Sequence, residues 1–283
     1  MMIGAGLCWS TGGILVRNVK VADPWEIVFW RSVFMVGFML GVLALWHRGR
    51  TFERIAAVGR EGAISGALLG STFFFFILSV TRNTVANTMV LMSIGPFFAA
   101  VFGWIFLGER VPSRIWGALA AALAGIVLMF FEGLESGRTL GNVLALGVPA
   151  AFALNVVVLR RSHASVSMVP AVMLAGIFSI IISLPLAWPL SCTLRDLTVL
   201  WIMGWLQLGL GCVLMTMATR HLPAGELGLF MLLETTLGPV WVWLGLGERP
   251  ASTALAGGLV VIGALLVNGL LAMRVRPSLR PGS

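Results

Sequence analysis

The sequence WIFLGER occupies residues 104–110, and the closely similar sequence WLGLGER stands 139 residues later, at 243–249. In both copies an apolar run ends in Leu-Gly-Glu-Arg, and a glycine at that place is typical of the residue that ends a helix. Repetition over such a distance indicates two related halves. We therefore divide the chain into a first half, residues 1–138, and a second half, residues 139–283.

Composition places both halves in a membrane. Of the 283 residues, 59% are hydrophobic and 11% are charged, against about 25% charged residues in soluble domains. The mean hydropathy is +0.99. The 30 ionised residues are too few to cover a soluble protein of this length, and the abundance of large apolar residues excludes a disordered chain. An integral membrane protein remains.

Apolar runs bounded by charged residues or proline predict ten membrane-spanning helices, five in each half. The expected spans are residues 2–19, 25–46, 61–80, 84–107, 112–131, 141–159, 168–189, 197–219, 224–246 and 251–272. The expected fold class is therefore an all-α integral membrane protein. Because five is an odd number, the second half would enter the membrane upside down. Such inverted-topology repeats occur in secondary transporters, whose substrate site lies near the midplane between the halves.

The basic residues lie at the ends of the apolar runs and form no stripe interleaved with aromatic residues. They therefore indicate membrane topology and argue against nucleic acid as a partner. With the N-terminus in the cytoplasm, twelve of them lie inside and six outside. This distribution predicts that both termini are cytoplasmic, in a multi-pass protein of the bacterial inner membrane. Ten spans can enclose a pathway in one chain, so we expect a monomer.

Polar side chains at membrane depth are the first candidates for a binding site. Glu234 lies near the centre of the span 224–246 and could bind a substrate amino group or carry a proton. The alternative is a protonated carboxyl group that bonds a neighbouring helix, because burial favours the neutral form. Gln207 and Asn155 lie inside spans as well. They are stronger candidates than hydroxyl residues, which can bond their own helix backbone.

Hydroxyl residues at similar depth could line a cavity and bind a zwitterion; they are Ser10, Ser71, Thr72, Ser93 and Thr235. Bonding to their own helix backbone is the strong alternative for all of them. Trp9 lies mid-span beside Ser10, and we single it out as an aromatic wall of the pocket. For most of the 11 Trp and 17 Phe residues we expect packing against lipid.

Arg31 lies about a turn and a half inside the span 25–46. It could attract a carboxylate substrate. The expectation that we favour is an arginine that snorkels to the outer interface or pairs with Glu26.

Two further patterns concern movement and turns. Gly62, Gly66 and Gly70 recur every four residues in the span 61–80, a stripe that allows close helix contact and sliding or, equally well, static packing. Pro96 and Pro239 can bend their helices. In the repeated motif, the residues Gly108, Glu109, Gly247 and Glu248 are interpreted as parts of tight helix–helix turns, with an interfacial gate on each side as the alternative.

Ten spans in two five-helix halves, each with a Gly-Glu pair after its fourth helix, resemble the drug/metabolite transporter superfamily, specifically its EamA-type branch. Abundant Trp and Phe without Tyr also resemble the aromatic amino-acid exporters of this branch. The resemblance implies gating by the third and eighth helices. The family usually has Glu-Pro midway along its ninth helix, whereas this chain has Glu234-Thr235, with Pro239 four residues further on.

The function that we expect is a secondary transporter that exports small metabolites, amino acids and aromatic ones first, by alternating access. Efflux of cationic drugs, transport of another metabolite, or a non-transporting membrane scaffold are the alternatives. An enzyme is disfavoured because the three histidines lie at loop edges and no Walker A sequence occurs. We expect no cofactor and no metal; the partners are a small-molecule substrate and the lipid bilayer.

Overall fold

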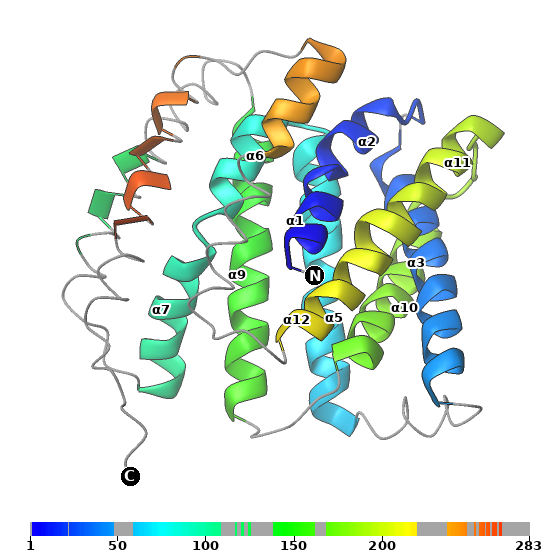
Figure 1. The fold of residues 1–283 in the computed structure, drawn as a ribbon, viewed down its shortest axis with the longest axis horizontal. Helices are drawn as coiled ribbons and strands as arrows, with labels where there is room; N and C mark the ends of the chain where they lie inside the picture. The colour runs from blue at the N-terminus through cyan, green and yellow to red at the C-terminus, as the bar shows by residue number, and fades with distance from the viewer. Residues whose placement is uncertain are drawn as a thin grey trace.

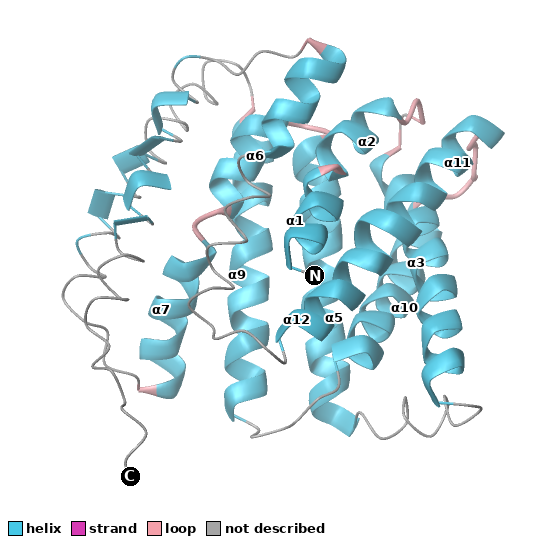
Figure 2. Cartoon of the chain, in the orientation of Figure 1, coloured by secondary structure: helices cyan, strands magenta, loops and turns pink. Residues whose placement is uncertain are grey.

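The computed structural model describes residues 2–21, 23–47, 59–108, 138–161, 168–219 and 237–247, together with scattered residues at 117–125 and 252–267. In these residues all regular structure is helical (Figure 2). Five helical stretches among them are long and apolar enough to cross a membrane. The prediction of an all-α membrane protein is therefore confirmed. The ten spans and the inverted repeat stay predictions, because most of the span expected at 112–131 and much of that at 251–272 lie outside the described residues.

In the first half the helices are α1 (Met2–Ser10), α2 (Gly12–Asn18), α3 (Pro24–His47), α5 (Gly59–Val80), α6 (Val85–Met92) and α7 (Gly95–Leu107). In the second half they are α9 (Thr139–Arg161), α10 (Met168–Leu186), α11 (Leu194–Ile202), the π-helix η1 (Met203–Leu210) and α12 (Gly211–Thr219). A further helical stretch covers Leu237–Leu246. Apolar length predicted the ends of α3, α5 and α9 within two residues.

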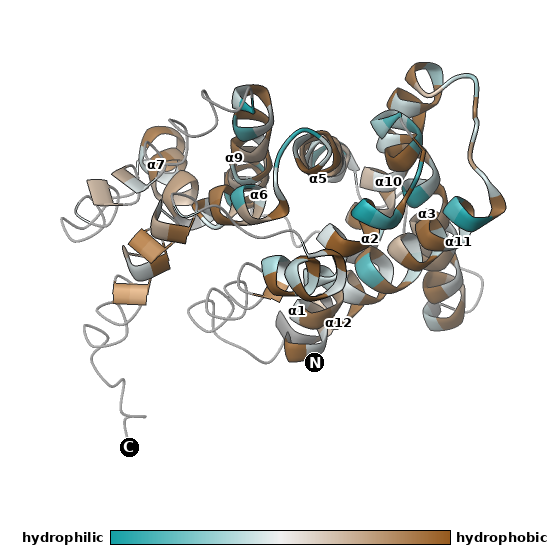
Figure 3. Cartoon of the chain, turned by 90° about the horizontal axis from the view of Figure 1, so that it is seen from above, coloured by the Kyte–Doolittle hydropathy of each residue, from teal (hydrophilic) through white to brown (hydrophobic). Residues whose placement is uncertain are grey.

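Helices of the two halves interleave around α5, which is the central helix (Figures 1 and 3). α9 packs on one side of α5 and α10 on the other, and α10 also packs against α3. η1 packs against α3, and α12 against α1. A space enclosed by these helices is consequently bounded by both halves of the chain.

Glycines let α5 approach α10 closely. A Cβ atom on Gly70 would lie 2.8 Å from the ring of Phe178 and 2.9 Å from the carbonyl oxygen of Ala175. Gly66 meets α10 in the same way, at Leu174, and Gly62 is buried as well. Close contact with α10 is therefore observed at Gly66 and Gly70, while a role of the stripe in sliding stays a prediction.

Three of the apolar spans are interrupted. α1 ends at Ser10 and α2 begins at Gly12, and α6 ends at Met92 before α7 begins at Gly95. Pro96 stands in the first turn of α7, where a residue without an N–H does not break helical bonding but cannot continue a preceding helix. The third interruption is η1, a π-helical segment between α11 and α12, and π-helical turns are frequent at functional sites.

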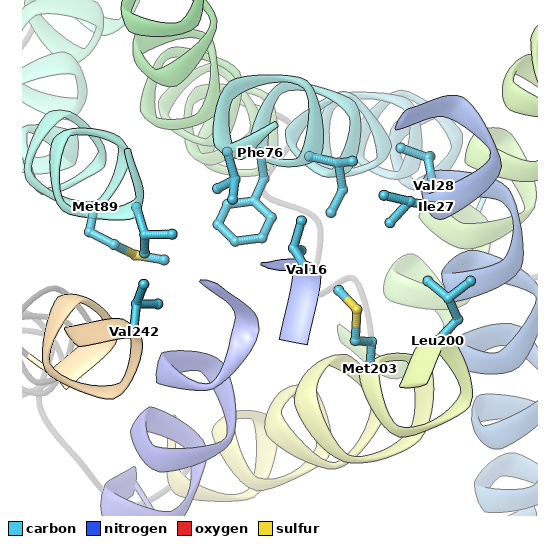
Figure 4. Close-up of a cluster of buried hydrophobic side chains, with 11 residues drawn as sticks. Val16, Ile27, Val28, Phe76, Met89, Leu200, Met203 and Val242 are labelled. Carbon is cyan, nitrogen blue, oxygen red and sulfur yellow. The ribbon is translucent and has the colours of Figure 1, made fainter. Parts of the chain in front are cut away.

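The buried apolar core consists of two clusters that join the halves. In the first, Val16, Phe76 and Met89 of the first half meet Met203 and Val242 of the second (Figure 4). The second cluster combines Met39, Phe73 and Met173 from α3, α5 and α10 with other residues. Lipid tails are as apolar as these side chains, so inside a membrane such clusters stabilise the structure through close van der Waals packing. The relative placement of the two halves is thus fixed by packing around α5.

The two copies of the repeated motif end their helices in the same way. Gly108 has φ +66° and Gly247 has φ +70°, a left-handed conformation that favours glycine. The N–H of Gly108 bonds the carbonyl oxygen of Trp104 at 3.2 Å, and that of Gly247 bonds Trp243 at 3.0 Å. This supports the turn interpretation of both glycines. Glu109 and Glu248 lie outside the described residues.

Candidate functional site

A cavity of about 190 Å³ lies between α1, α3, α5, α6, α9, α10, η1 and α12. Among the described residues its aromatic lining consists of Trp9, Phe73, Phe76 and Phe152, and its polar lining includes Arg31, Thr72 and Gln207. A protein cavity of about 150 Å³ is sufficient to hold benzene. The cavity therefore suits a molecule of about the size of an amino acid.

The interrupted spans border this cavity. Trp9 lies two residues before the break at Thr11, Met92 is the last residue of α6, and Gln207 belongs to η1. Irregular backbone is tolerated inside a membrane where it lines a cavity. Discontinuous helices near the midplane build substrate sites in secondary transporters. The cavity is thus a candidate substrate site on grounds of backbone structure as well as lining.

Arg31 lies inside the protein beside the cavity, with 1% of its surface exposed. Its Nη2 donates a hydrogen bond to the carbonyl oxygen of Phe73 at 3.3 Å. The guanidinium carbon lies over the ring of Phe73, 5.3 Å from its centroid, and 5.9 Å from that of Phe76. Nε is buried without a hydrogen-bond partner in the described structure. The expectation that this side chain snorkels to the outer interface is therefore wrong.

Pairing of Arg31 with Glu26 was also expected, and it is wrong as well. The carboxylate of Glu26 accepts hydrogen bonds from the backbone N–H groups of Ser191 at 2.7 Å and Cys192 at 2.8 Å, and from the Ser191 hydroxyl at 2.9 Å. The sequence held a signal against the pair. Side chains meet along a helix at spacings of three or four residues, whereas Glu26 and Arg31 are five apart and point to different faces.

Close packing of η1 on α3 keeps Arg31 and Gln207 at the same cavity. A Cβ atom on Gly204 would lie 2.7 Å from the carbonyl oxygen of Arg31 and 2.8 Å from the backbone nitrogen of Met35. Gly204 stands three residues before Gln207 in η1. The glycine thus permits the backbone approach that brings the amide and the guanidinium to one space.

Gln207 is 4% exposed, and its Oε1 is buried without a hydrogen-bond partner in the described structure. A Cβ atom on Gly12 would lie 3.0 Å from its Nε2, so the glycine at the start of α2 leaves room for the amide. A buried acceptor without a partner costs about 1–3 kcal/mol. The geometry therefore fits an acceptor that awaits a ligand.

The hydroxyl candidates mostly follow the backbone-bonding alternative. Ser71 donates to the carbonyl oxygen of Ala67 at 2.9 Å, Thr72 to Leu69 at 2.6 Å, and Ser93 to Val90 at 2.7 Å. Ser10 likewise donates to the carbonyl oxygen of Leu7 at 2.8 Å. Of these four residues, Thr72 borders the cavity and the other three do not. The expectation that Ser10, Ser71 and Ser93 line the pocket is not supported by these positions.

The other predicted site residues have four different placements. Trp9 borders the cavity as expected. Asn155 is 2% exposed, and its Oδ1 has no hydrogen-bond partner among the residues that the structure describes, but it does not border the cavity. Pro239 is the third residue of the stretch Leu237–Leu246. Glu234 and Thr235 lie outside the described residues.

Comparison with known proteins agrees with this architecture. The model of the EamA-like transporter family matches residues 1–131 and again residues 139–270. The pseudopaline exporter CntI of Pseudomonas aeruginosa (strain UCBPP-PA14) is 26% identical over 274 residues, which cover 93% of this chain and 92% of that protein. Protein RarD of Salmonella typhi is 23% identical over 158 residues, covering 54% of this chain and 51% of RarD.

A solved crystal structure shares the fold, with a TM-score of 0.68 and 18% sequence identity over 98% of this chain and 97% of the other. The family predicted from the helix pattern and the Gly-Glu pairs is therefore confirmed. Membership of this family indicates a transporter and not an enzyme. The chain belongs to the EamA-like transporter family of the drug/metabolite transporter superfamily.

Proposed function

We propose that the chain exports small metabolites, amino acids and in particular aromatic ones, across the bacterial inner membrane by alternating access. The observation that carries this proposal is the cavity of about 190 Å³, which combines an aromatic wall with a guanidinium and an amide. Binding sites for small molecules are predominantly apolar, with a few placed polar groups that fix orientation. The lining has this composition.

The aromatic faces of Trp9, Phe73 and Phe76 suit a flat apolar side chain. Paired aromatic rings gain about 0.5–1.5 kcal/mol beyond the burial of their area. The polar groups suit the other end of an amino acid, because Arg31 donates hydrogen bonds and Gln207 can accept them. The cavity volume of about 190 Å³ admits such a molecule.

Export by alternating access is supported by family and by architecture. CntI, 26% identical over nearly the whole chain, is named as an exporter of pseudopaline. Helices of both halves bound the cavity, and glycine contacts let α5 lie directly against α10. Movement of one half relative to the other would expose the cavity to alternate sides.

Efflux of cationic drugs fits the described residues less well. A cation in the cavity would meet the buried guanidinium of Arg31, and like charges at low dielectric repel strongly. Family membership opposes a scaffold without transport activity. Metabolites of similar size with an anionic group remain compatible with the same lining.

The test is transport into liposomes that contain the purified protein, with labelled phenylalanine, leucine and threonine beside a cationic dye. We expect saturable phenylalanine transport that exceeds that of threonine. Trp9→Ala should reduce phenylalanine transport about three- to tenfold, as the loss of one aromatic contact implies, with a smaller effect on threonine. Trp188→Ala is the matched control, because Trp188 is 73% exposed. Dye transport without amino-acid transport would refute the proposal.

A further inference from the structure

The charges around the cavity do not balance among the described residues. Arg31 is 1% exposed and borders the cavity, and in the described structure it forms no ion pair. Its one recorded hydrogen bond goes to a neutral acceptor, the carbonyl oxygen of Phe73. Burial of a charged group is costly unless the group is paired and hydrogen-bonded. A cation in this setting calls for an anionic partner.

The nearest acidic residue in the sequence is already engaged. Glu26 directs both carboxylate oxygens to Ser191 and Cys192 on the segment that connects α10 to α11. The rings of Phe73 and Phe76 contribute attraction through their faces, but such contacts supply a fraction of what an ion pair supplies. The donor at Nε stays without a partner in the described structure.

We infer that the cavity takes ligands that carry a carboxylate group, that Arg31 binds this group, and that analogues of the same shape without a carboxylate are rejected. The inference rests on the proposed function and adds the chemical class of the substrate. A guanidinium presents five N–H donors in a planar fork that matches the two oxygens of a carboxylate. The apolar lining strengthens that contact, because electrostatic interactions gain at low dielectric.

Rejection of analogues without a carboxylate follows from the same geometry. A site built to bond a polar group discriminates strongly against a ligand that lacks it, because its own buried groups are then left unpaired. Phenylalaninamide differs from phenylalanine by replacement of the carboxylate, while the ring and the amino group stay. Hydrocinnamate keeps the carboxylate and lacks the amino group, and phenethylamine has the reverse pattern.

The first experiment uses the wild-type protein in detergent and measures binding of these four compounds by calorimetry and by the shift of the melting temperature. We expect phenylalanine to bind at least tenfold more tightly than phenylalaninamide and phenethylamine, a factor that corresponds to about 1.4 kcal/mol, and hydrocinnamate to retain measurable binding. Equal binding of phenylalanine and its amide overturns the inference and leaves the proposed function standing. Absence of binding by all four compounds contradicts the proposed function and the inference with it.

The second experiment assigns the selectivity to Arg31. Arg31→Gln should reduce the preference for phenylalanine over its amide to less than threefold, and Arg31→Lys should retain part of it, since the charge stays while the fork is lost. Arg195→Gln is the matched control, because Arg195 is exposed at the start of α11. A preference that survives in Arg31→Gln overturns the assignment.

An internal partner for Arg31 is the competing explanation, and Glu234 is the residue to test. If the two side chains paired, Arg31→Gln and Glu234→Gln would each lower the melting temperature, and the double variant would recover it. That recovery would overturn the inference. We expect instead that Arg31→Gln raises the melting temperature without ligand, since a buried unpaired charge is removed.

Discussion

The indole N–H of Trp241 donates a hydrogen bond to the hydroxyl oxygen of Ser10, with a separation of 3.0 Å between residues 231 positions apart. Ser10 donates its own proton to the carbonyl oxygen of Leu7. The hydroxyl therefore links α1 to the stretch Leu237–Leu246 and is not free for a substrate. One residue further along that stretch, Val242 packs with Val16 and Met89 in the core (Figure 4).

Replacement of Ser10 should accordingly affect stability more than transport. Ser10→Ala removes the acceptor of a partly buried indole N–H, and we expect a loss of about 1 kcal/mol in unfolding free energy, with substrate affinity unchanged. Trp241→Phe should remove the same contact, so the double variant should lose less than the sum of the single changes. Thr198→Ala is the control, because that exposed hydroxyl bonds its own helix at Leu194. Normal stability of Ser10→Ala together with weakened substrate binding would instead indicate that Ser10 belongs to the binding site.

A second prediction concerns the contact between α5 and α10. Gly70→Ala forces a Cβ atom against the ring of Phe178 and the carbonyl oxygen of Ala175, and overpacking of this kind costs about 1–3 kcal/mol. Gly41→Ala on α3 is the control, since a Cβ there meets nothing within 4 Å. Melting temperatures of the two purified variants provide the measurement. If Gly70→Ala is as stable as Gly41→Ala, the helices are not held in this close contact.

Hydropathy predicted where helices begin and end because the energy of a span depends on its apolar length. The span 25–46 corresponds to α3, Pro24–His47, and the span 61–80 to α5, Gly59–Val80. The hydropathy pattern carries no information about the course of the backbone within a span. The break at Thr11 and the π-helical segment Met203–Leu210 change hydrogen bonds and leave hydropathy unaltered, so they could not be foreseen.

The site was predicted in part for a related reason. Trp9 and Gln207 were chosen by depth, and both border the cavity; their roles in binding stay predictions. Arg31 lies within reach of the membrane interface. Whether its side chain points to the interface or to the cavity depends on the rotation of α3 about its axis, and the close contact of Gly204 with the α3 backbone constrains that rotation. A contact between residues so distant in sequence has no signature in a single sequence.

The third prediction concerns the thiol of Cys192, which lies on the segment between α10 and α11. Partial burial, a hydrogen bond to Glu26 and the negative charges of Glu26 and Asp196 raise the pKa of Cys192 to about 12. Because the thiolate is the reactive form and roughly one Cys192 side chain in ten thousand is a thiolate at pH 8, maleimide labelling should be slow. Labelling should accelerate steeply only as the pH approaches the pKa.

Glu26→Gln removes one of those charges and should lower the pKa of Cys192, so labelling at pH 8 should become several times faster. The measurement uses a background in which Cys8 and Cys212 are replaced by Ala. Asp23→Asn is the control, because Asp23 is not among the groups that raise this pKa. Identical labelling rates with and without the Glu26→Gln substitution would show that the carboxylate does not control the thiol.

The last prediction separates ligand binding from stability at Gln207. Its Oε1 is buried at the cavity without a hydrogen-bond partner in the described structure, and the protein without ligand bears that cost. Gln207→Leu fills similar space without a polar atom, so the melting temperature should rise, by an amount that reflects about 1 kcal/mol or more. Phenylalanine binding should fall roughly tenfold, since a substrate ammonium would lose a hydrogen-bond acceptor.

Ser65→Ala is the matched control, because the Ser65 hydroxyl is also buried without a partner in the described structure and does not border the cavity. That variant should gain stability and keep its affinity. If Gln207→Leu instead loses stability together with binding, the amide supports the packing of η1 on its neighbours, and recognition of the ammonium must be sought elsewhere.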